Sequence, residues 1–149
     1  VRALRAGEMV GVFPEATISR SFMLKKFKTG AARMAADSGA PLLPVILWGT
    51  QQLWTKGRPK TLTKRHVPVT IMIGEPIELA PGDKPVMVTR RLRAAMSEML
   101  DRAQREYPGK PSGPEDTWWQ PAHLGGTAPT LEVAEAEDEA EAERRANRD

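Results

Sequence analysis

The feature that most constrains the fold is an apolar run, then a helix-forming segment, then a second apolar run. Residues 8–13 (EMVGVF) lie between a glycine and a proline, as expected for a short buried strand. Residues 28–41 are rich in alanine and predict a helix capped by Thr29 and ended by Gly39. Residues 41–49 (PLLPVILWG) are apolar on both faces, which is typical of a central parallel strand. This order predicts a right-handed strand–helix–strand unit.

The next two segments extend this pattern. Residues 67–77 (VPVTIMIGEPI) predict a third strand, and residues 84–107 predict a long helix. One face of that helix is apolar at helical spacing, and its members are Leu92, Ala95, Met96, Met99, Leu100, Ala103 and Tyr107. We therefore expect an α/β fold, with a mainly parallel sheet and flanking helices.

The composition changes after the long helix, which predicts three regions. Residues 1–107 form the folded domain. Residues 108–131 contain many prolines and glycines, and form either a linker or an extension docked by Trp118 and Trp119. Residues 132–149 are mostly alanine and charged residues, with too few large apolar side chains to pack, so we expect a disordered acidic tail.

Charge is distributed unevenly along the 149 residues. The whole chain has 19 acidic and 22 basic residues, of which residues 132–149 hold 8 and 3. The remaining 11 acidic and 19 basic residues give residues 1–131 a net charge of +8. A basic domain favours anionic partners, such as phosphorylated small molecules, anionic lipid or nucleic acid.

Several features limit the class of protein. There is no cysteine, which excludes disulfides and thiol chemistry and fits a reducing compartment. No apolar stretch approaches the about 20 residues of a membrane-spanning helix, so we expect no transmembrane segment, although the chain can still lie against a membrane. The sequence begins with valine and has no signal-peptide pattern, and we expect that an amino-terminal piece is missing.

Residues 14–28 are the first candidate for a binding site. Hydroxyl and basic side chains gather there at the expected end of a strand, where α/β sheets bind ligands. They are Thr17, Ser19, Arg20, Ser21, Lys25, Lys26 and Lys28. Such groups suit the oxygens of a phosphate. Glu15 accepts hydrogen bonds when ionised, either from a substrate hydroxyl or from backbone N–H groups of the loop. The same residue types also fit a solvated turn without a ligand.

Other patterns give weaker indications. Lys28 leads into a helix amino terminus, which favours an anion, although a capped helix without a ligand explains it equally. The two histidines, His66 and His123, have no metal-site spacing, and we expect no metal ion. Residues 48–66 mix tryptophan with many cations. This loop fits an anionic membrane surface, a nucleic acid or a solubilising role.

Three blocks taken together resemble the glycerolipid acyltransferases, specifically the 1-acyl-sn-glycerol-3-phosphate acyltransferases. They are VFPEATISRS, FKTGAARMA and APLLPVILWG, which occur in the family order and at similar distances. Residues 71–79 (IMIGEPIEL) resemble a later strand of these enzymes. The resemblance covers about residues 1–107 and implies the fold of that family.

The resemblance implies an enzyme of phospholipid biosynthesis. It transfers an acyl group from a thioester, acyl-CoA or acyl carrier protein, to the hydroxyl of a lysophospholipid such as lysophosphatidic acid. No other cofactor is implied. The resemblance assigns acceptor binding to Glu15, Thr17 and Ser19, and makes Lys28 a candidate phosphate partner. It also implies a peripheral position on the cytoplasmic face of a membrane.

Departures from the family pattern qualify this expectation. Ala16 and Ile18 replace a glycine and an arginine of the family block, and Arg20 is a candidate substitute for that arginine. The family base belongs to a His-x4-Asp motif, but here His66 and His123 are followed at that spacing by Ile71 and Ala128. We therefore expect the acceptor-binding, carboxyl-terminal part of such an enzyme without its catalytic base. A non-catalytic module for anionic lipid is the alternative, and nucleic acid is a less favoured partner.

Overall fold

The computed structural model describes residues 1–61 and 63–147, and the chain divides into two compact units. The first unit consists of Val1–Thr17, Leu24–Gly49 and Pro68–Tyr107. The second unit consists of Ile18–Met23, Thr50–Val67 and Pro108–Asp149, of which Leu62, Arg148 and Asp149 lie outside the described residues. Parts of the predicted loop 48–66 and of the predicted tail 132–149 therefore lie outside the described residues.

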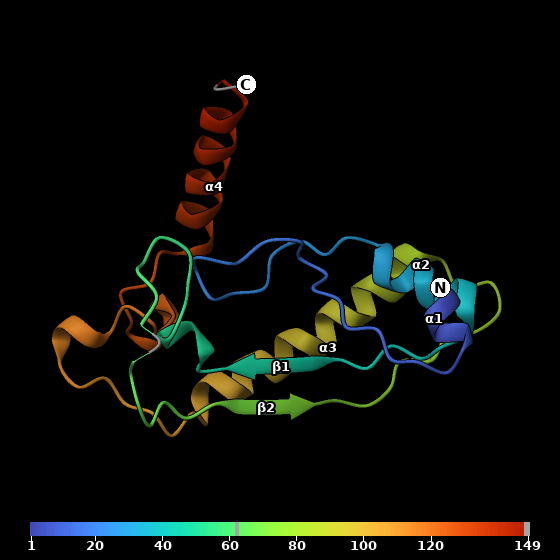
Figure 1. Ribbon diagram of the computed structural model, residues 1–149, viewed down its shortest axis with the longest axis horizontal. Coiled ribbons are helices and arrows are strands. Elements are labelled where there is room, and N and C mark those ends of the chain that lie inside the picture. The colour runs from blue at the N-terminus through green and yellow to red at the C-terminus, as the bar shows by residue number, and fades with distance from the viewer. Residues whose placement is uncertain (62, 148–149) are drawn as a thin grey trace. The chain divides into compact units, whose positions relative to one another are not determined.

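The first unit contains three helices and one pair of strands. The helices are α1 (Arg2–Arg5), α2 (Gly30–Ser38) and α3 (Pro85–Arg105), and the strands are β1 (Val45–Trp48) and β2 (Thr70–Ile73). Figure 1 shows α3 alongside the two strands, and it contacts both of them and α2. This helix is the element around which the first unit packs.

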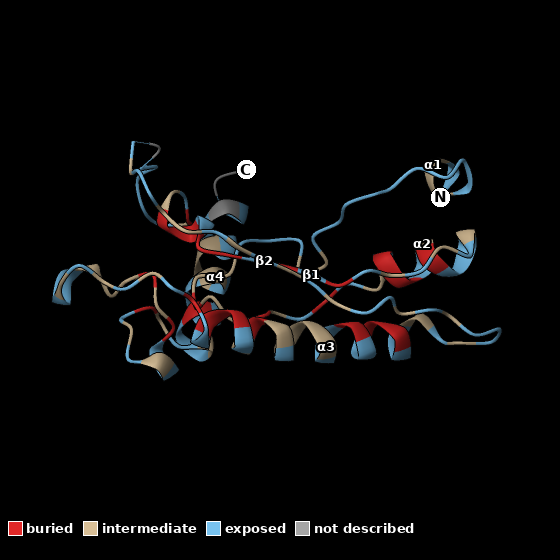
Figure 2. Ribbon diagram, turned by 90° about the horizontal axis from the view of Figure 1, so that it is seen from below, coloured by how far each residue is buried: buried red, intermediate tan, exposed pale blue. Residues whose placement is uncertain are grey.

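The amphipathic pattern of α3 is confirmed. Leu92, Leu100, Ala103 and Tyr107 are buried, while the exposed face carries charged residues (Figure 2). The Tyr107 hydroxyl donates a hydrogen bond of 2.6 Å to the carbonyl oxygen of Pro68. Its ring packs edge-on against Trp48 of β1, with the ring centres 6.4 Å apart. These contacts fix the end of α3 against both strands.

Helix α2 confirms one sequence prediction and corrects another. Gly39 ends the helix in the left-handed conformation, with φ of 74° and its N–H on the Ala35 carbonyl, as predicted. Thr29 occupies the capping position, but its side chain makes no capping hydrogen bond. The helix buries its alanine face, Ala31, Ala32 and Ala35, because small side chains allow a close approach.

The strands differ from the predicted arrangement. β1 and β2 pair antiparallel, with Val45 opposite Ile73 and Leu47 opposite Ile71, and no third strand joins them within the described residues. The prediction of a strand over residues 8–13 is wrong, because that segment has no regular secondary structure and pairs with neither β1 nor β2. Within the described residues the strand–helix–strand unit predicted for residues 8–49 therefore lacks its first strand, and the antiparallel pair does not test the predicted mainly parallel sheet.

Burial of β1 also differs from the prediction of a strand covered on both faces. Ile46 and Trp48 are buried, whereas Val45 and Leu47 are partly exposed. Met9 and Phe13 are 98% and 87% exposed. The first unit thus presents apolar side chains to its surroundings from the pair of strands and from the segment that precedes residue 14.

The described part of the second unit contains three short 3₁₀ helices and one α-helix. They are η1 (Thr50–Gln52), η2 (Pro114–Asp116), η3 (Ala122–Leu124) and α4 (Leu131–Ala146). Trp119 is buried at 2% exposure, and its carbonyl oxygen accepts a hydrogen bond from the Gln51 side chain. Helix α4 lies where the sequence predicts a disordered tail. No helix in the described part of the chain is both long enough and apolar enough to cross a bilayer.

Candidate functional site

The loop of residues 14–28 is closed at its base within the first unit. The Lys28 N–H donates a 2.8 Å hydrogen bond to the Pro14 carbonyl oxygen. The Lys25 N–H donates a 2.7 Å hydrogen bond to Oε2 of Glu15. Two contacts across the neck of the loop hold its ends together, while its central residues 18–23 belong to the second unit. The loop therefore has a fixed base.

Helix α3 reinforces this base. The Arg93 guanidinium donates hydrogen bonds of 2.9 and 3.0 Å to the carbonyl oxygens of Leu24 and Lys25. Leu24 and Phe27 are buried beside it. The position of the loop therefore depends on a residue from the most regular helix of the unit, which is a rigid support for a binding loop.

Glu15 serves the loop in the structure. The sequence left two roles open for Glu15, which are binding a substrate hydroxyl and fixing the loop backbone. The hydrogen bond from the Lys25 N–H corresponds to the second role, and it uses Oε2 and not Oε1. Burial raises the pKa of Glu15, and the Lys25 N–H together with the charges of Lys25 and Arg93 offset part of that rise. A half-buried carboxylate is thus held at the neck of the loop.

Backbone strain gathers in the same loop. Ala16 and Phe22 have φ angles of 60° and 59°, and they are two of the three non-glycine residues with positive φ among residues 1–61 and 63–147. Such conformations are costly for residues with a side chain and tend to occur at functional sites. Ala16 stands where the family block has glycine, so this chain keeps the left-handed conformation without the residue that suits it.

The structure divides the five candidate residues between the two units. Glu15, Thr17 and Lys28 belong to the first, and the side chains of Thr17 and Lys28 are exposed. Ser19 and Arg20 belong to the second, where the Ser19 hydroxyl lies 3.1 Å from that of Ser21. Ser21 is almost fully buried, and its Oγ also accepts a hydrogen bond from the Met23 N–H, which gives it a structural role.

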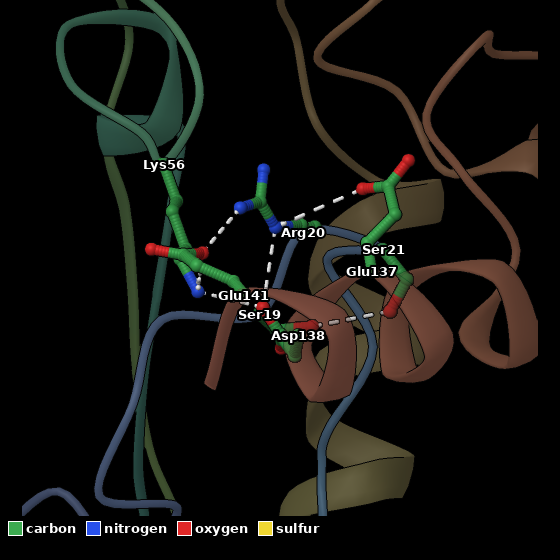
Figure 3. Close-up of polar contacts among 7 residues, drawn as sticks. All are labelled: Ser19, Arg20, Ser21, Lys56, Glu137, Asp138 and Glu141. Carbon is green, nitrogen blue, oxygen red and sulfur yellow. Dashed lines mark hydrogen bonds and ion pairs between the residues drawn. The ribbon is translucent and has the colours of Figure 1, made fainter. Parts of the chain in front are cut away.

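Arg20 is part of a charge network within the second unit (Figure 3). Its guanidinium lies 3.2 Å from Oδ1 of Asp138 and 2.7 Å from Oε2 of Glu141. The Lys56 ammonium lies 2.6 and 2.8 Å from the same two oxygens. A longer contact of 3.7 Å joins Arg20 to Glu137. Two cations thus share two carboxylates of α4.

This network is shielded from water on most sides. The side chains of Arg20, Lys56, Asp138 and Glu141 are between 15% and 23% exposed. Hydrogen bonds to Asp138 and Glu141 raise the pKa of Lys56. At Gly57, a Cβ atom would lie 2.9 Å from Nη1 of Arg20, so the absence of a side chain lets the guanidinium approach the backbone closely.

The sequence interpretation missed the partners of Arg20. Lys56 was placed in a general cationic loop, and Asp138 and Glu141 in a disordered tail. The available signal was the spacing of the two acids, three residues apart, which puts them on one face of a helix. Their pairing with Arg20 leaves no local pattern, because Asp138 and Glu141 lie 118 and 121 residues away from it in the sequence.

Three other cations of residues 48–66, Arg58, Lys60 and Lys64, also have partners inside the second unit. Lys60 lies over the ring of Trp54 at 4.0 Å, and Arg58 over Trp118 at 4.2 Å. Lys64 donates to the Gln52 side chain. Cations that already have partners inside the unit are less available to a membrane or a nucleic acid, so these contacts do not favour a general cationic patch for anionic surfaces. Among the described residues no group of acidic or histidine side chains could hold a metal ion.

Comparisons with known proteins point to one family. The model of the family described as Acyltransferase matches residues 1–48, which include every candidate residue of the loop. The 1-acyl-sn-glycerol-3-phosphate acyltransferase of Bacillus subtilis is 31% identical over 113 residues, covering 74% of this chain and 50% of that protein. No solved structure matches the chain significantly.

Plant relatives carry the same name. The enzyme of Limnanthes douglasii is 42% identical over 66 residues, covering 44% of this chain and 22% of its own length. A chloroplastic enzyme of Arabidopsis thaliana is 33% identical over 98 residues, covering 66% and 26%. The chain therefore spans half or less of the length of these curated relatives.

We predict that Ala16→Gly stabilises the protein, by up to about 1 kcal/mol. Glycine adopts a φ of 60° without the clash that alanine meets there, and this gain exceeds the added flexibility of the unfolded chain. Urea unfolding measures the change. The matched substitution Ala36→Gly, at an exposed position inside α2, should instead destabilise by about 1 kcal/mol. A loss of stability in Ala16→Gly equal to that in Ala36→Gly would contradict the strained geometry.

We also predict a pH dependence that comes from Glu15. Since its pKa is higher in the folded state than the ordinary 4.5, the folded protein binds this proton more tightly. The resulting stability is complete below the unfolded pKa and is lost as pH rises through the folded pKa. Relative to Glu15→Gln, which keeps an acceptor for the Lys25 N–H, the wild type should lose free energy of unfolding between mildly acidic and neutral pH. Parallel urea-unfolding profiles for the two proteins would refute this.

Proposed function

The chain belongs to the acyltransferase family, and from this premise we propose that it provides the acceptor-binding part of a 1-acyl-sn-glycerol-3-phosphate acyltransferase. The observation that carries the proposal is the braced loop of residues 14–28, which lies wholly inside the region that the family model matches. The fold that we propose for the complete protein is that of the glycerolipid acyltransferases, with residues 1–107 as the part of the domain present here.

Each candidate residue receives a role by its chemistry. Glu15 shapes the loop through the Lys25 N–H, and Oε1 faces a hydroxyl of the glycerol unit. Thr17 and Ser19 offer hydroxyl groups to the glycerol phosphate. Lys28 and Arg20 provide positive charge for its phosphate, with arginine able to bind two oxygens at once. The basic character of residues 1–131 supports the choice of an anionic acceptor.

The reaction of the complete enzyme is acyl transfer. The free hydroxyl of the lysophospholipid attacks the carbonyl carbon of a thioester, acyl-CoA or acyl carrier protein, so that a C–O bond forms and the C–S bond breaks. A base removes the hydroxyl proton, and the thiolate leaves as a thiol after protonation. Neither His66 nor His123 has an aspartate at the family spacing, so we assign the base to a part of the protein outside residues 1–149.

A peripheral position on the cytoplasmic face of a membrane follows from the acceptor. A lysophospholipid has an acyl chain that stays in the bilayer, so its headgroup is reached at the membrane surface. Met9 and Phe13, which are almost fully exposed directly before the loop, support contact with the apolar part of the lipid.

Binding of the acceptor headgroup tests the proposed site. We predict that the chain binds sn-glycerol 3-phosphate, and that Ser19→Ala or Lys28→Ala weakens binding about tenfold, since each removes a direct phosphate or glycerol contact. Isothermal titration calorimetry measures the affinities. Lys110→Ala removes an exposed cation outside the loop and serves as the control. Equal weakening in all three variants, with steep salt dependence, would instead favour a module that binds anionic surfaces nonspecifically.

Purified residues 1–149 should not catalyse the reaction. With acyl-CoA and 1-acyl-sn-glycerol 3-phosphate we expect release of thiol at the rate of the uncatalysed mixture, because the chain has no His-x4-Asp base. A thiol-release assay checks this, and turnover that disappears in His66→Ala or His123→Ala would show that one of these histidines acts as the base after all.

A further inference from the structure

The network around Arg20 joins a candidate phosphate ligand to the acidic helix α4 inside the second unit. Arg20 and Lys56 each contact Oδ1 of Asp138 and Oε2 of Glu141, at distances between 2.6 and 3.2 Å (Figure 3). The two carboxylates that both cations contact carry two negative charges, and Glu137 adds a longer contact of 3.7 Å to Arg20 alone. A phosphate monoester also carries about two negative charges near neutral pH.

The geometry of the two cations suits a phosphate. A guanidinium offers a planar fork of donors, and an ammonium offers a point charge with three donors. Arg20 and Lys56 approach the same pair of oxygens, so their donors converge on one small region. Three terminal phosphate oxygens could occupy the region that the two α4 carboxylate oxygens now fill. The carboxylates thus imitate the ligand that this pair would bind.

Helix α4 is attached to its unit by few apolar contacts. Ala134 is its only buried apolar residue among Leu131–Ala146 with described side chains, and Val133 is half exposed. The ion pairs of Asp138 and Glu141 with Arg20 and Lys56 therefore contribute much of the binding of α4 to the rest of its unit. Partly shielded ion pairs of this kind can exchange partners when a ligand offers equivalent charge, since the protein loses little buried apolar area.

We propose that α4 is an internal competitor for the acceptor phosphate: Asp138 and Glu141 occupy Arg20 and Lys56, and a phosphate monoester binds this pair by displacing them. The inference deepens the proposed function and rests on it for the identity of the ligand as a lysophospholipid phosphate. Lys56 becomes a phosphate ligand that the family block does not contain. The acidic helix sets the concentration of acceptor at which the site fills.

The test compares variants made in residues 1–149. Asp138→Asn with Glu141→Gln removes the two carboxylates that contact both cations, keeps the side-chain shapes and leaves Glu137 at its longer distance of 3.7 Å from Arg20. We expect the apparent dissociation constant for sn-glycerol 3-phosphate to fall about tenfold or more, because affinity is reduced by the fraction of molecules in which the site is occupied. The control is Glu139→Gln with Glu143→Gln, which changes net charge equally at two exposed positions of α4 and should change affinity little.

Further variants connect the gain to the proposed cations. Adding Arg20→Gln and Lys56→Gln to the variant with Asp138→Asn and Glu141→Gln should abolish its gain in affinity for sn-glycerol 3-phosphate. The inference is overturned by an unchanged affinity in the neutralised helix, by an equal gain in the control, by a gain that survives loss of both cations, or by no phosphate binding in any variant. Circular dichroism of each variant verifies that it remains folded.

Two probes distinguish the source of the phosphate. Phosphatidylcholine vesicles with and without 1-acyl-sn-glycerol 3-phosphate report the lipid headgroup, and inorganic phosphate reports the free ion. A gain of about tenfold for the vesicles that contain the lysolipid supports the inference for the lipid. A gain for inorganic phosphate alone supports the competing helix but contradicts the proposed lipid acceptor, whereas binding that depends on Ser19 and Lys28 and ignores α4 contradicts only the competing helix.

Discussion

The hydrogen bond between the Lys25 N–H and the Glu15 carboxylate closes the loop on which the proposed function depends. With the Lys28 N–H on the Pro14 carbonyl, it fixes the neck of residues 14–28. Arg93 of α3 then donates hydrogen bonds to the carbonyl oxygens of Leu24 and Lys25, in the second half of the loop. The packing of α3 against β1 and β2 thus positions the candidate acceptor loop through a single guanidinium. The partial burial of Glu15 is the energetic cost of this closure, and the Lys25 N–H and the nearby cations offset only part of it, so the pKa of Glu15 stays raised.

A second constraint is charge balance inside the second unit. Residues 1–131 carry an excess of cations, and α4 supplies carboxylates to two of them. The contacts leave Arg20 and Lys56 neutralised without a bound ligand, which stabilises the isolated unit. In the proposed mechanism the same contacts link stability to ligand binding, because a phosphate would use the donors that now contact the helix. A protein organised in this way would respond to acceptor concentration through a change in one helix.

The features that were predicted correctly from the sequence are those that depend on local patterns of residues. The burial of α3 follows from apolar spacing, and the end of α2 at Gly39 follows from the left-handed preference of glycine. The strand predicted over residues 8–13 failed because a strand needs partners that its own sequence does not specify. The candidate loop was found from its residue types, but the pairing of Arg20 with Asp138 was not, because it joins segments 118 residues apart. Composition alone also favoured disorder where α4 forms.

The most direct test of the account is a map of backbone amides by NMR during titration with sn-glycerol 3-phosphate. If the loop binds the acceptor headgroup, the largest chemical-shift changes should lie at residues 15–28, with smaller changes in α4 as its carboxylates are displaced. Shifts that leave residues 15–28 unchanged, while appearing elsewhere in the chain, would contradict the assignment of this loop to the acceptor.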